Sequence, residues 1–330
     1  MKLSVDVGNG YVKAVNERGE TLHFPTVIRI NTSHAQFGNG GMKYRIRIND
    51  VDYYIGTLAI SQKGVRHWGN NDSLLDDTGN YAALCSHILC KPDENGETNI
   101  DLLLGLPYDQ YMKQRDTQDK LNNLQGKQFK TVMNDEIKTA VIKTVSLCPQ
   151  GIGAYFFNIS DIHGNPRKDA EKRMNALVID VGYGTTDIVA FDGQDGAFDH
   201  IEDDSFCMNN EGVYNIDMRV REAVKDKGLD VDVTVIETAL QANDSKVDSI
   251  KGQFDLKPYE DKEYESLSRE ILKQLSVKLK GGHELYRNIY LTGGGAKKLF
   301  PFIQKQIPGI QLQEDYIYCN CKGYLALANS

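Results

Sequence analysis

The sequence predicts an α/β protein built from two related halves, and three observations carry that expectation. The phrase Asp-Val-Gly-X-Gly occurs twice, in DVGNGYVK at positions 6–13 and in DVGYGTTD at positions 180–187. Each copy directly follows a run of β-branched and aliphatic residues, which is typical of a buried strand. The order of strand, glycine turn, strand and helix then recurs in both halves of the chain, which indicates a duplicated α/β fold.

Length and composition are those of an ordinary globular protein. The 330 residues are 40% hydrophobic and 25% charged, and they suffice for two domains. The formal charge of −8 argues against a broad surface for DNA or anionic lipid, because both need a local excess of Lys and Arg. The opening MKLSVDVG is unlike a signal peptide, and no stretch approaches the roughly 18 to 20 apolar residues of a membrane helix. We therefore expect a cytoplasmic protein without direct nucleic-acid or membrane contact.

The six cysteines show neither a CxxC pair nor a framework spacing, so we expect reduced and mostly buried thiols.

The first half reads as an α/β unit with a small addition. Its first 30 residues alternate as strand, turn, strand, turn, strand, and a polar, glycine-rich stretch with short strands follows. Further along we expect a helix at about 80–90, a buried strand at 99–106 that Pro107 ends, and a hairpin over 128–147. The segment CPQGIGAYFF then predicts a turn that opens an apolar helix.

The second half repeats the opening pattern. From position 175 the chain reads as strand, glycine turn and strand, with turns at Asp192-Gly193 and Asp195-Gly196 after it. Helical patterns follow at 212–227, 232–242 and 261–280. The stretch RNIYLTGGGAKKLF predicts one more strand, a triple-glycine turn and a helix, and the chain closes with a strand and a short terminal helix.

The glycine turns suit phosphate binding. A phosphate chain needs backbone N–H groups that point inward without a side chain in the way, and glycines in a tight turn supply both. In the first turn Gly8 and Gly10 leave the backbone open, and Lys13 is placed to counter phosphate charge. One such turn alone is usually a plain hairpin, but two copies indicate a clamp that holds phosphates from both sides.

The second turn offers Gly182 and Gly184, with the hydroxyls of Thr185 and Thr186 beside them. A Mg²⁺ ion would sit among waters held by Asp6 and Asp180, because this ion keeps most of its water shell and binds through few carboxylates.

The triple glycine 293–295 provides a third backbone surface, open enough for a nucleoside to lie against. Taken alone it is equally compatible with a simple corner between a strand and a helix.

These motifs in this order resemble the superfamily of actin, sugar kinases and heat-shock chaperones. The Asp6-to-Lys13 stretch resembles its first phosphate loop, ALVIDVGYGTTD its second and IYLTGGGA its adenosine motif. The two connecting helices of that family would fall at CPQGIGAYFF and NCKGYLALA. The resemblance implies an α/β, duplicated actin-like (ribonuclease H-like) two-domain fold with a central nucleotide cleft.

Within the superfamily the details are most similar to the actin-like filament proteins of the ParM group. The markers are YYIGTLA at 53–59, LLLGLP at 102–107, PQGIGA at 149–154 and the terminal Gly323-Tyr324. The resemblance spans the whole chain. It implies a domain I of residues 1–150 and 318–330, with a small peripheral subdomain at about 31–78, and a domain II of residues 151–317.

The resemblance also implies a mechanism, which is the hydrolysis of ATP or GTP with Mg²⁺ coupled to polymerisation. In it Gln150 orients the attacking water, while Asp6 and Asp180 organise the waters of the metal. The backbone and side chains expected to contact the nucleotide are Gly8, Asn9, Gly10, Tyr11, Lys13, Gly182, Tyr183, Gly184, Thr185, Thr186, Glu211, Gly212, Gly293, Gly294 and Gly295, with Glu211 and Gly212 towards the ribose. Asp187 belongs either to this site or to hydrogen bonding within its own hairpin.

Three functions compete on this basis. The first is a homopolymeric, filament-forming nucleotide hydrolase that segregates plasmid DNA through a separate DNA-binding adaptor protein. The second is a sugar or pantothenate-type kinase of the same superfamily, although the GLP and PQG turns offer no Asp that could serve as the base such a kinase needs. The third is a scaffold that binds nucleotide without turnover, although the chain shows no amphipathic membrane tail like that of some such relatives. We favour the first.

Overall fold

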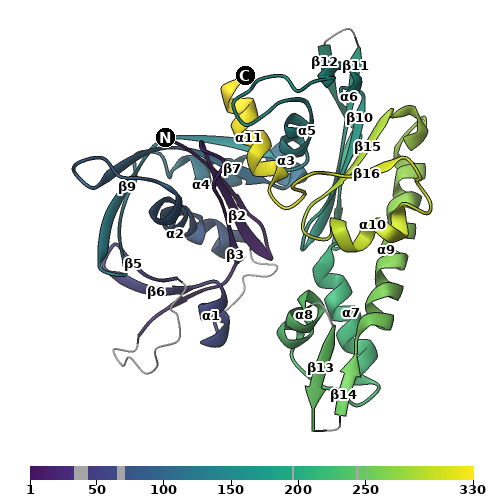
Figure 1. Cartoon of the computed structure of the whole chain (residues 1–330), viewed down its shortest axis with the longest axis horizontal. Helices are drawn as coiled ribbons and strands as arrows, with labels where there is room; N and C mark the ends of the chain where they lie inside the picture. The colour runs from purple at the N-terminus through teal and green to yellow at the C-terminus, as the bar shows by residue number, and fades with distance from the viewer. Residues whose placement is uncertain (33–43, 65–70, 195–196, 243–244, 251) are drawn as a thin grey trace. The chain divides into compact units, whose positions relative to one another are not determined.

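The computed structural model describes residues 1–32, 44–64, 71–194, 197–242, 245–250 and 252–330, and these fall into two compact units (Figure 1). The first unit comprises Met1–Lys172 and Ile317–Ser330, and the second comprises Arg173–Tyr316. The chain therefore leaves the first unit once and returns to it. The first unit includes the helix that follows position 150, which packs against the C-terminal helix.

A nine-stranded mixed sheet forms the framework of the first unit, in the order β3-β2-β1-β7-β9-β8-β5-β6-β4. Strands β1 and β7 are parallel, as are β7 and β9, and all other neighbours are antiparallel. The strands are β1 (Lys2–Val7), β2 (Tyr11–Asn16), β3 (Thr21–Pro25), β4 (Ile28–Ile30), β5 (Arg45–Ile48), β6 (Val51–Ile55), β7 (Glu97–Leu106), β8 (Gln128–Met133) and β9 (Glu136–Pro149).

Helices cover both faces of this sheet. Alternate residues of a strand point to opposite faces, and on β2 Val12 and Ala14 pack in the cluster that contains α2, whereas Val15 packs in the cluster that contains α11. In Figure 1 the strands β9, β5 and β6 curl around α2. The helices of this unit are α1 (Thr57–Ser61), α2 (Asn71–Leu89), α3 (Tyr108–Lys113), α4 (Arg115–Asn122), α5 (Ile152–Ile159) and α11 (Cys319–Asn329), and α6 (Ala170–Arg173) spans the division.

The strands expected in a small subdomain at about 31–78 belong to the main sheet. Strand β5 pairs with β8 through Arg47↔Val132 and Ile48↔Thr131, so β5, β6 and β4 continue the nine-stranded sheet to its edge. Residues 33–43 and 65–70 of that expected subdomain lie outside the described residues.

The second unit repeats the arrangement around a five-stranded sheet in the order β12-β11-β10-β15-β16. Strand β10 pairs antiparallel with β11 and parallel with β15, as β1 pairs with β2 and β7 in the first unit. The duplicated α/β fold is thereby confirmed. Its elements are β10 (Ala176–Val181), β11 (Thr185–Gln194), β12 (Ala197–Asn209), β13 (Lys246–Ser249), β14 (Gly252–Asp255), β15 (Asn288–Thr292), β16 (Ile310–Leu312), α7 (Val213–Lys225), α8 (Val233–Gln241), α9 (Lys257–Lys278), α10 (Ala296–Ile303) and the short 3₁₀ helix His283–Leu285.

The expected turn at Asp192-Gly193 is wrong. Strand β11 continues through this position, where Gly193 pairs with Phe198 of β12. A Cβ atom on Gly193 would lie 2.1 Å from Cβ of Met174, so this glycine serves a close approach of the backbone and not a turn. The expected turn at 195–196 lies outside the described residues.

Candidate functional site: two glycine hairpins, a glutamine turn and a triple glycine

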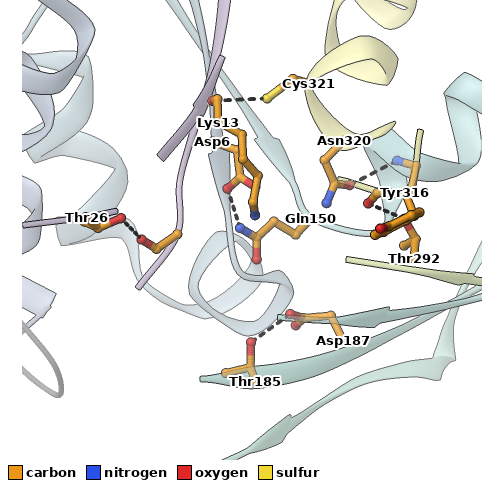
Figure 2. A network of polar contacts seen from close by, with 12 residues as sticks. Asp6, Lys13, Thr26, Gln150, Thr185, Asp187, Thr292, Tyr316, Asn320 and Cys321 are labelled. Carbon is orange, nitrogen blue, oxygen red and sulfur yellow. Dashed lines mark hydrogen bonds and ion pairs between the residues drawn. The ribbon is translucent and has the colours of Figure 1, made fainter. Parts of the chain in front are cut away.

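The first glycine turn joins β1 to β2 and is held closed from two sides. Gly8 N donates to Tyr11 O at 3.2 Å, so the turn is tight. Thr26 braces it, because its Oγ1 donates to Gly8 O at 2.6 Å and its N donates to Gly10 O at 2.9 Å (Figure 2). A Cβ atom on Gly8 would lie 3.0 Å from Tyr11 O, which explains the need for glycine. The turn thus keeps a fixed backbone shape without side chains at its glycines.

Asn9, at the tip of this turn, presents a polar atom that the described residues do not satisfy. Its Oδ1 is buried and has no hydrogen-bond partner within that part of the chain. Buried polar atoms are nearly always hydrogen-bonded in native proteins, so we expect this oxygen to accept a hydrogen bond from a ligand or from water.

Asp6 is the centre of a buried polar cluster in the first unit. Its side chain is 1% exposed and lies directly across the ladder from Lys13, whose Nζ is 3.0 Å from Oδ2. Its other oxygen, Oδ1, accepts from Nε2 of Gln150 at 2.6 Å (Figure 2). A buried carboxylate needs such partners, because removing the charge from water is costly unless it is paired and hydrogen-bonded. Lys13 from the same hairpin and Gln150 from 144 positions along the chain therefore meet at one carboxylate.

Gln150 stands in a turn at the end of β9 that is itself well fixed. Its backbone N donates to Leu106 O of β7 at 2.7 Å, and Gly151 follows with φ +80° before α5 begins. The amide nitrogen of the side chain is bound to Asp6, and its carbonyl oxygen Oε1 is thereby left as the acceptor. The side chain is oriented as an acceptor of one hydrogen bond from solvent or ligand.

Buried thiols lie beside this cluster. Cys321 Sγ contacts Lys13 O at 3.4 Å, and burial, with the nearby Asp6 carboxylate, raises the pKa of this thiol. Burial likewise raises the pKa of Cys148, just before Gln150, to about 11. All six cysteines are free thiols and five are buried, as expected. Cys321 and Cys148 therefore stay protonated near neutral pH, and a protonated thiol is a poor nucleophile.

The second glycine turn copies the first in its backbone but not in its charge. Gly182 N donates to Thr185 O at 2.8 Å, as Gly8 N does to Tyr11 O. Asp180 lies across the ladder from Asp187, in the place that Lys13 occupies opposite Asp6. Both carboxylates are buried, and like charges directly opposite on neighbouring strands repel. This turn is therefore suited to a cation, and Asp187 also accepts from Thr185 Oγ1 at 3.0 Å within its own hairpin.

The start of α7 is attached to this second turn. Val213 N and Tyr214 N donate to the carbonyls of Gly182 and Tyr183, and Thr186 Oγ1 donates to Glu211 O at 2.5 Å. A Cβ atom on Gly212 would lie 2.5 Å from Tyr183 O. This close approach of two backbones is possible only with glycine.

The triple glycine closes onto the same turn. Gly293 has φ +90°, and a Cβ atom there would lie 2.3 Å from Oδ1 of Asp180. Gly295 N donates to Val181 O at 3.0 Å, whereas a Cβ atom on Gly294 would meet nothing within 4 Å. Two of the glycines therefore serve packing, and the middle one faces open space.

The structure thus gathers the expected residues into two sets. Within the first unit it brings together Asp6, Gly8, Asn9, Gly10, Tyr11, Lys13 and Gln150. Within the second it brings together Asp180, Gly182, Tyr183, Gly184, Thr185, Thr186, Glu211, Gly212, Gly293, Gly294 and Gly295.

Sequence reasoning missed four residues that hold these sets. Thr26 braces the first turn, and Asn320 holds the turn that carries Gln150 (Figure 2). Thr292 Oγ1 and Gly293 N both donate to Tyr316 O, at 3.1 and 3.0 Å. Thr292 and Asn320 lie within the quoted stretches IYLTGGGA and NCKGYLALA, but those patterns assign them no partner. Only the tertiary contacts disclose the roles of these residues.

The carboxylates fit a hydrated ion and not a protein-ligated one. No group of three or more His, Cys, Asp or Glu side chains that could hold a metal occurs among the described residues. Mg²⁺ binds through one or two carboxylates, its own waters and phosphate oxygens. Each turn by itself offers a buried carboxylate of the kind that can accept from such waters, Asp6 in the first and Asp180 in the second.

Comparison with models of known protein families shows which family this chain belongs to. Residues 4–153 match the family model of the actin-like protein N-terminal domain, and residues 178–305 match that of the archaeal MreB-like actin homologue C-terminal domain. The chain is an actin-like protein. Each match contains one of the glycine hairpins, and the second also contains the triple glycine.

Solved structures share the fold of this actin-like chain. A non-polymerisable quadruple mutant of pCBH ParM is 23% identical with a TM-score of 0.79, over 99% of this chain and 98% of that one. A 15-stranded ParM filament from Clostridium botulinum is 21% identical with a TM-score of 0.80, over 99% and 98%. An archaeal actin homologue in complex with ADP is 20% identical with a TM-score of 0.70, over 99% and 98%.

No curated protein sequence matches this actin-like chain. In the described part of the chain, no helix has the length and apolar character needed to cross a membrane.

Proposed function

We propose that this actin-like protein binds ATP or GTP with Mg²⁺, hydrolyses it, and assembles with copies of itself into filaments. The observation that carries the proposal is the repeated hairpin closure, Gly8 N to Tyr11 O and Gly182 N to Thr185 O, each next to a buried aspartate. Structures of the same fold include a ParM filament and an archaeal actin homologue in complex with ADP, which supports self-assembly and nucleotide binding in this chain as well.

Phosphate binding falls to the two turns. Their glycine backbones hold a fixed shape in which N–H groups can approach phosphate oxygens, and Lys13 contributes positive charge in the first turn. Lys13 Nζ donates to Asp6 Oδ2 at 3.0 Å, so its positive charge is held at the first turn. Mg²⁺ would supply neutralisation of the phosphate charge, with Asp6 and Asp180 accepting hydrogen bonds from its waters.

Hydrolysis needs an oriented water and little more. Gln150 meets that need, because its Nε2 donates to Asp6 and its Oε1 is left to accept a hydrogen bond from water. A neutral amide orients the water without removing its proton, so we expect slow turnover.

The nucleoside is assigned to the second unit. The open position at Gly294 leaves room for a ring to lie against the backbone, and Glu211 and Gly212 border the same turn towards the ribose. Segregation of plasmid DNA through a separate adaptor follows from the resemblance to the ParM group, and the net charge of −8 suits a cytoplasmic filament that does not itself touch DNA.

The test is to mix purified protein with Mg-ATP, and separately with Mg-GTP, and to follow light scattering and phosphate release together. We expect scattering to rise and then to decline as phosphate appears, and Gln150→Ala to slow the decline. Phosphate release without scattering at any protein concentration would refute the filament, and a screen of sugar and vitamin acceptors would then test the kinase alternative.

A further inference from the structure

The amino end of α5 is capped by a side chain from a different helix. The first amides of a helix have no partner within it, and a side chain directly before the helix usually satisfies them. In α5 that position is Gly151, which has no side chain to offer. Asn320 of α11 takes over, because its Oδ1 accepts from Gly151 N at 3.0 Å and from Ala154 N at 3.1 Å.

Two glycines make this arrangement possible. A Cβ atom on Gly323 of α11 would lie 1.6 Å from Gly153 O, and a Cβ atom on Gly153 would lie 2.7 Å from Asn320 O. The two helices therefore touch backbone to backbone, which brings the short Asn320 side chain within reach of the α5 amides. Asn320 itself is 6% exposed, so water does not compete for its oxygen.

The capped amide belongs to the turn that carries Gln150. On one side of that residue the backbone is held by Leu106 O, and on the other side the next amide is held by Asn320. The remaining constraint is the bond from the Gln150 side chain to Asp6. Asn320 thus fixes one of the three points that determine where the amide of Gln150 stands.

We propose that Asn320 is a positioning residue for hydrolysis, which acts through Gln150 and not on the nucleotide. This inference rests on the proposed function. Asn320 holds the peptide after Gln150 so that Oε1 meets the attacking water. A displacement of about 1 Å in such a group costs on the order of a hundredfold in rate, because reacting atoms must be aligned.

Two substitutions separate the hydrogen bonds from the volume of the side chain. Asn320→Asp keeps an oxygen that accepts from both amides, and a carboxylate is also favourable at the amino end of a helix. Asn320→Leu has a similar size but no acceptor. We expect the Asp variant to hydrolyse nucleotide within about threefold of wild type, and the Leu variant to lose roughly tenfold to a hundredfold in kcat with the nucleotide Kd unchanged.

A double-mutant cycle with Gln150→Ala shows whether Asn320 acts through Gln150. Phosphate release and the Kd of a fluorescent, non-hydrolysable ATP or GTP analogue are measured for wild type, both single variants and Asn320→Leu/Gln150→Ala. We expect the Leu substitution to lower kcat in the wild-type background and to leave it unchanged in the Gln150→Ala background. If the Leu variant does not fold, Asn320→Ser, which is too short to reach both amides, takes its place in the cycle.

Four results would count against these proposals. Equal losses in both backgrounds, or a loss confined to Kd, would overturn the positioning role of Asn320. Wild-type kcat in a folded Leu variant, while Gln150→Ala is impaired, would overturn it as well and leave the proposed function intact. A wild-type protein that binds the analogue but hydrolyses neither ATP nor GTP would instead refute the proposed hydrolysis, on which this inference depends.

Discussion

Gly293→Ala tests whether the triple glycine is built for Asp180 or is only a corner between β15 and α10. Gly293 has φ +90°, and a Cβ atom there would lie 2.3 Å from Oδ1 of Asp180 and 2.5 Å from Val181 O. The left-handed backbone costs a non-glycine residue about 1–2 kcal/mol. Forcing a methyl group into a packed site costs about 1–3 kcal/mol more. We therefore expect a loss of about 2–5 kcal/mol in the free energy of unfolding.

Gly294→Ala is the matched control for stability, because a Cβ atom there meets nothing within 4 Å. Removing a glycine where the backbone allows it stabilises a protein by about 0.4–1 kcal/mol through the unfolded state. The assay is thermal unfolding followed by calorimetry, in which a loss of this size lowers the midpoint of the second unit by on the order of 10 °C. Equal midpoints for Gly293→Ala and Gly294→Ala would refute the packing of Gly293 against Asp180.

Three further predictions concern the first unit. Gly323→Ala places a Cβ atom 1.6 Å from Gly153 O, so we expect its free energy of unfolding in urea to be at least about 3 kcal/mol lower than that of wild type. Leu327→Ala, on the exposed side of α11, should stay within about 1 kcal/mol of wild type, and equal losses in the two variants would contradict the glycine contact. Lys13→Met leaves the Asp6 carboxylate buried without its cation, so we expect the free energy of unfolding to fall by about 3–5 kcal/mol and Lys13→Met/Asp6→Asn to restore most of it. A double variant no more stable than Lys13→Met would show that the unpaired charge is not the cause. Burial, and secondarily Lys138, lowers the pKa of His87 to about 4, below its value of about 6.5 in the unfolded chain. The unfolded chain therefore binds the proton more tightly, and we expect the free energy of unfolding to fall by up to about 3 kcal/mol as the pH drops from 6.5 to 4. His87→Asn should flatten that fall in urea titrations at several pH values, and an unchanged slope would disprove the role of His87.

The elements that sequence predicts best are those whose cause is local. The runs KLSVDV and ALVIDV are buried almost throughout, and they become the strands β1 and β10 that lead into the glycine turns. A glycine pattern in a tight turn reports a requirement of the backbone at that position, so both turns are where the sequence places them.

Long-range effects explain what the sequence does not show. Strand β12 carries the acidic residues Glu202, Asp203 and Asp204 and still pairs along β11, because an edge strand keeps one side in water. Helix α9 starts at Lys257, before the expected position 261, because Pro258 fits the first turn of a helix and does not break it. Gly193 resembles a turn residue, but its role is set by Met174 from another segment.

In the candidate site, too, the sequence predicts the residues of a local motif and does not predict the long-range contacts. Asp6, Lys13 and Asp180 could be predicted because they accompany a repeated glycine phrase. The contact of Gln150 with Asp6 and the cap that Asn320 provides join residues far apart in the sequence, and no spacing encodes them.

Calorimetric titration of the purified protein with Mg-ATP and with Mg-GTP shows whether residues of both units take part in nucleotide binding. Wild type, Lys13→Gln in the first unit and Gly294→Val in the second unit are compared, with Gly309→Ala as a control at a glycine that also faces open space. We predict one nucleotide bound per chain, at least about tenfold weaker binding in each of the two site variants, and wild-type binding in the control. Absence of binding at millimolar nucleotide, or equal affinity in all four proteins, would refute nucleotide binding at the first turn and the triple glycine.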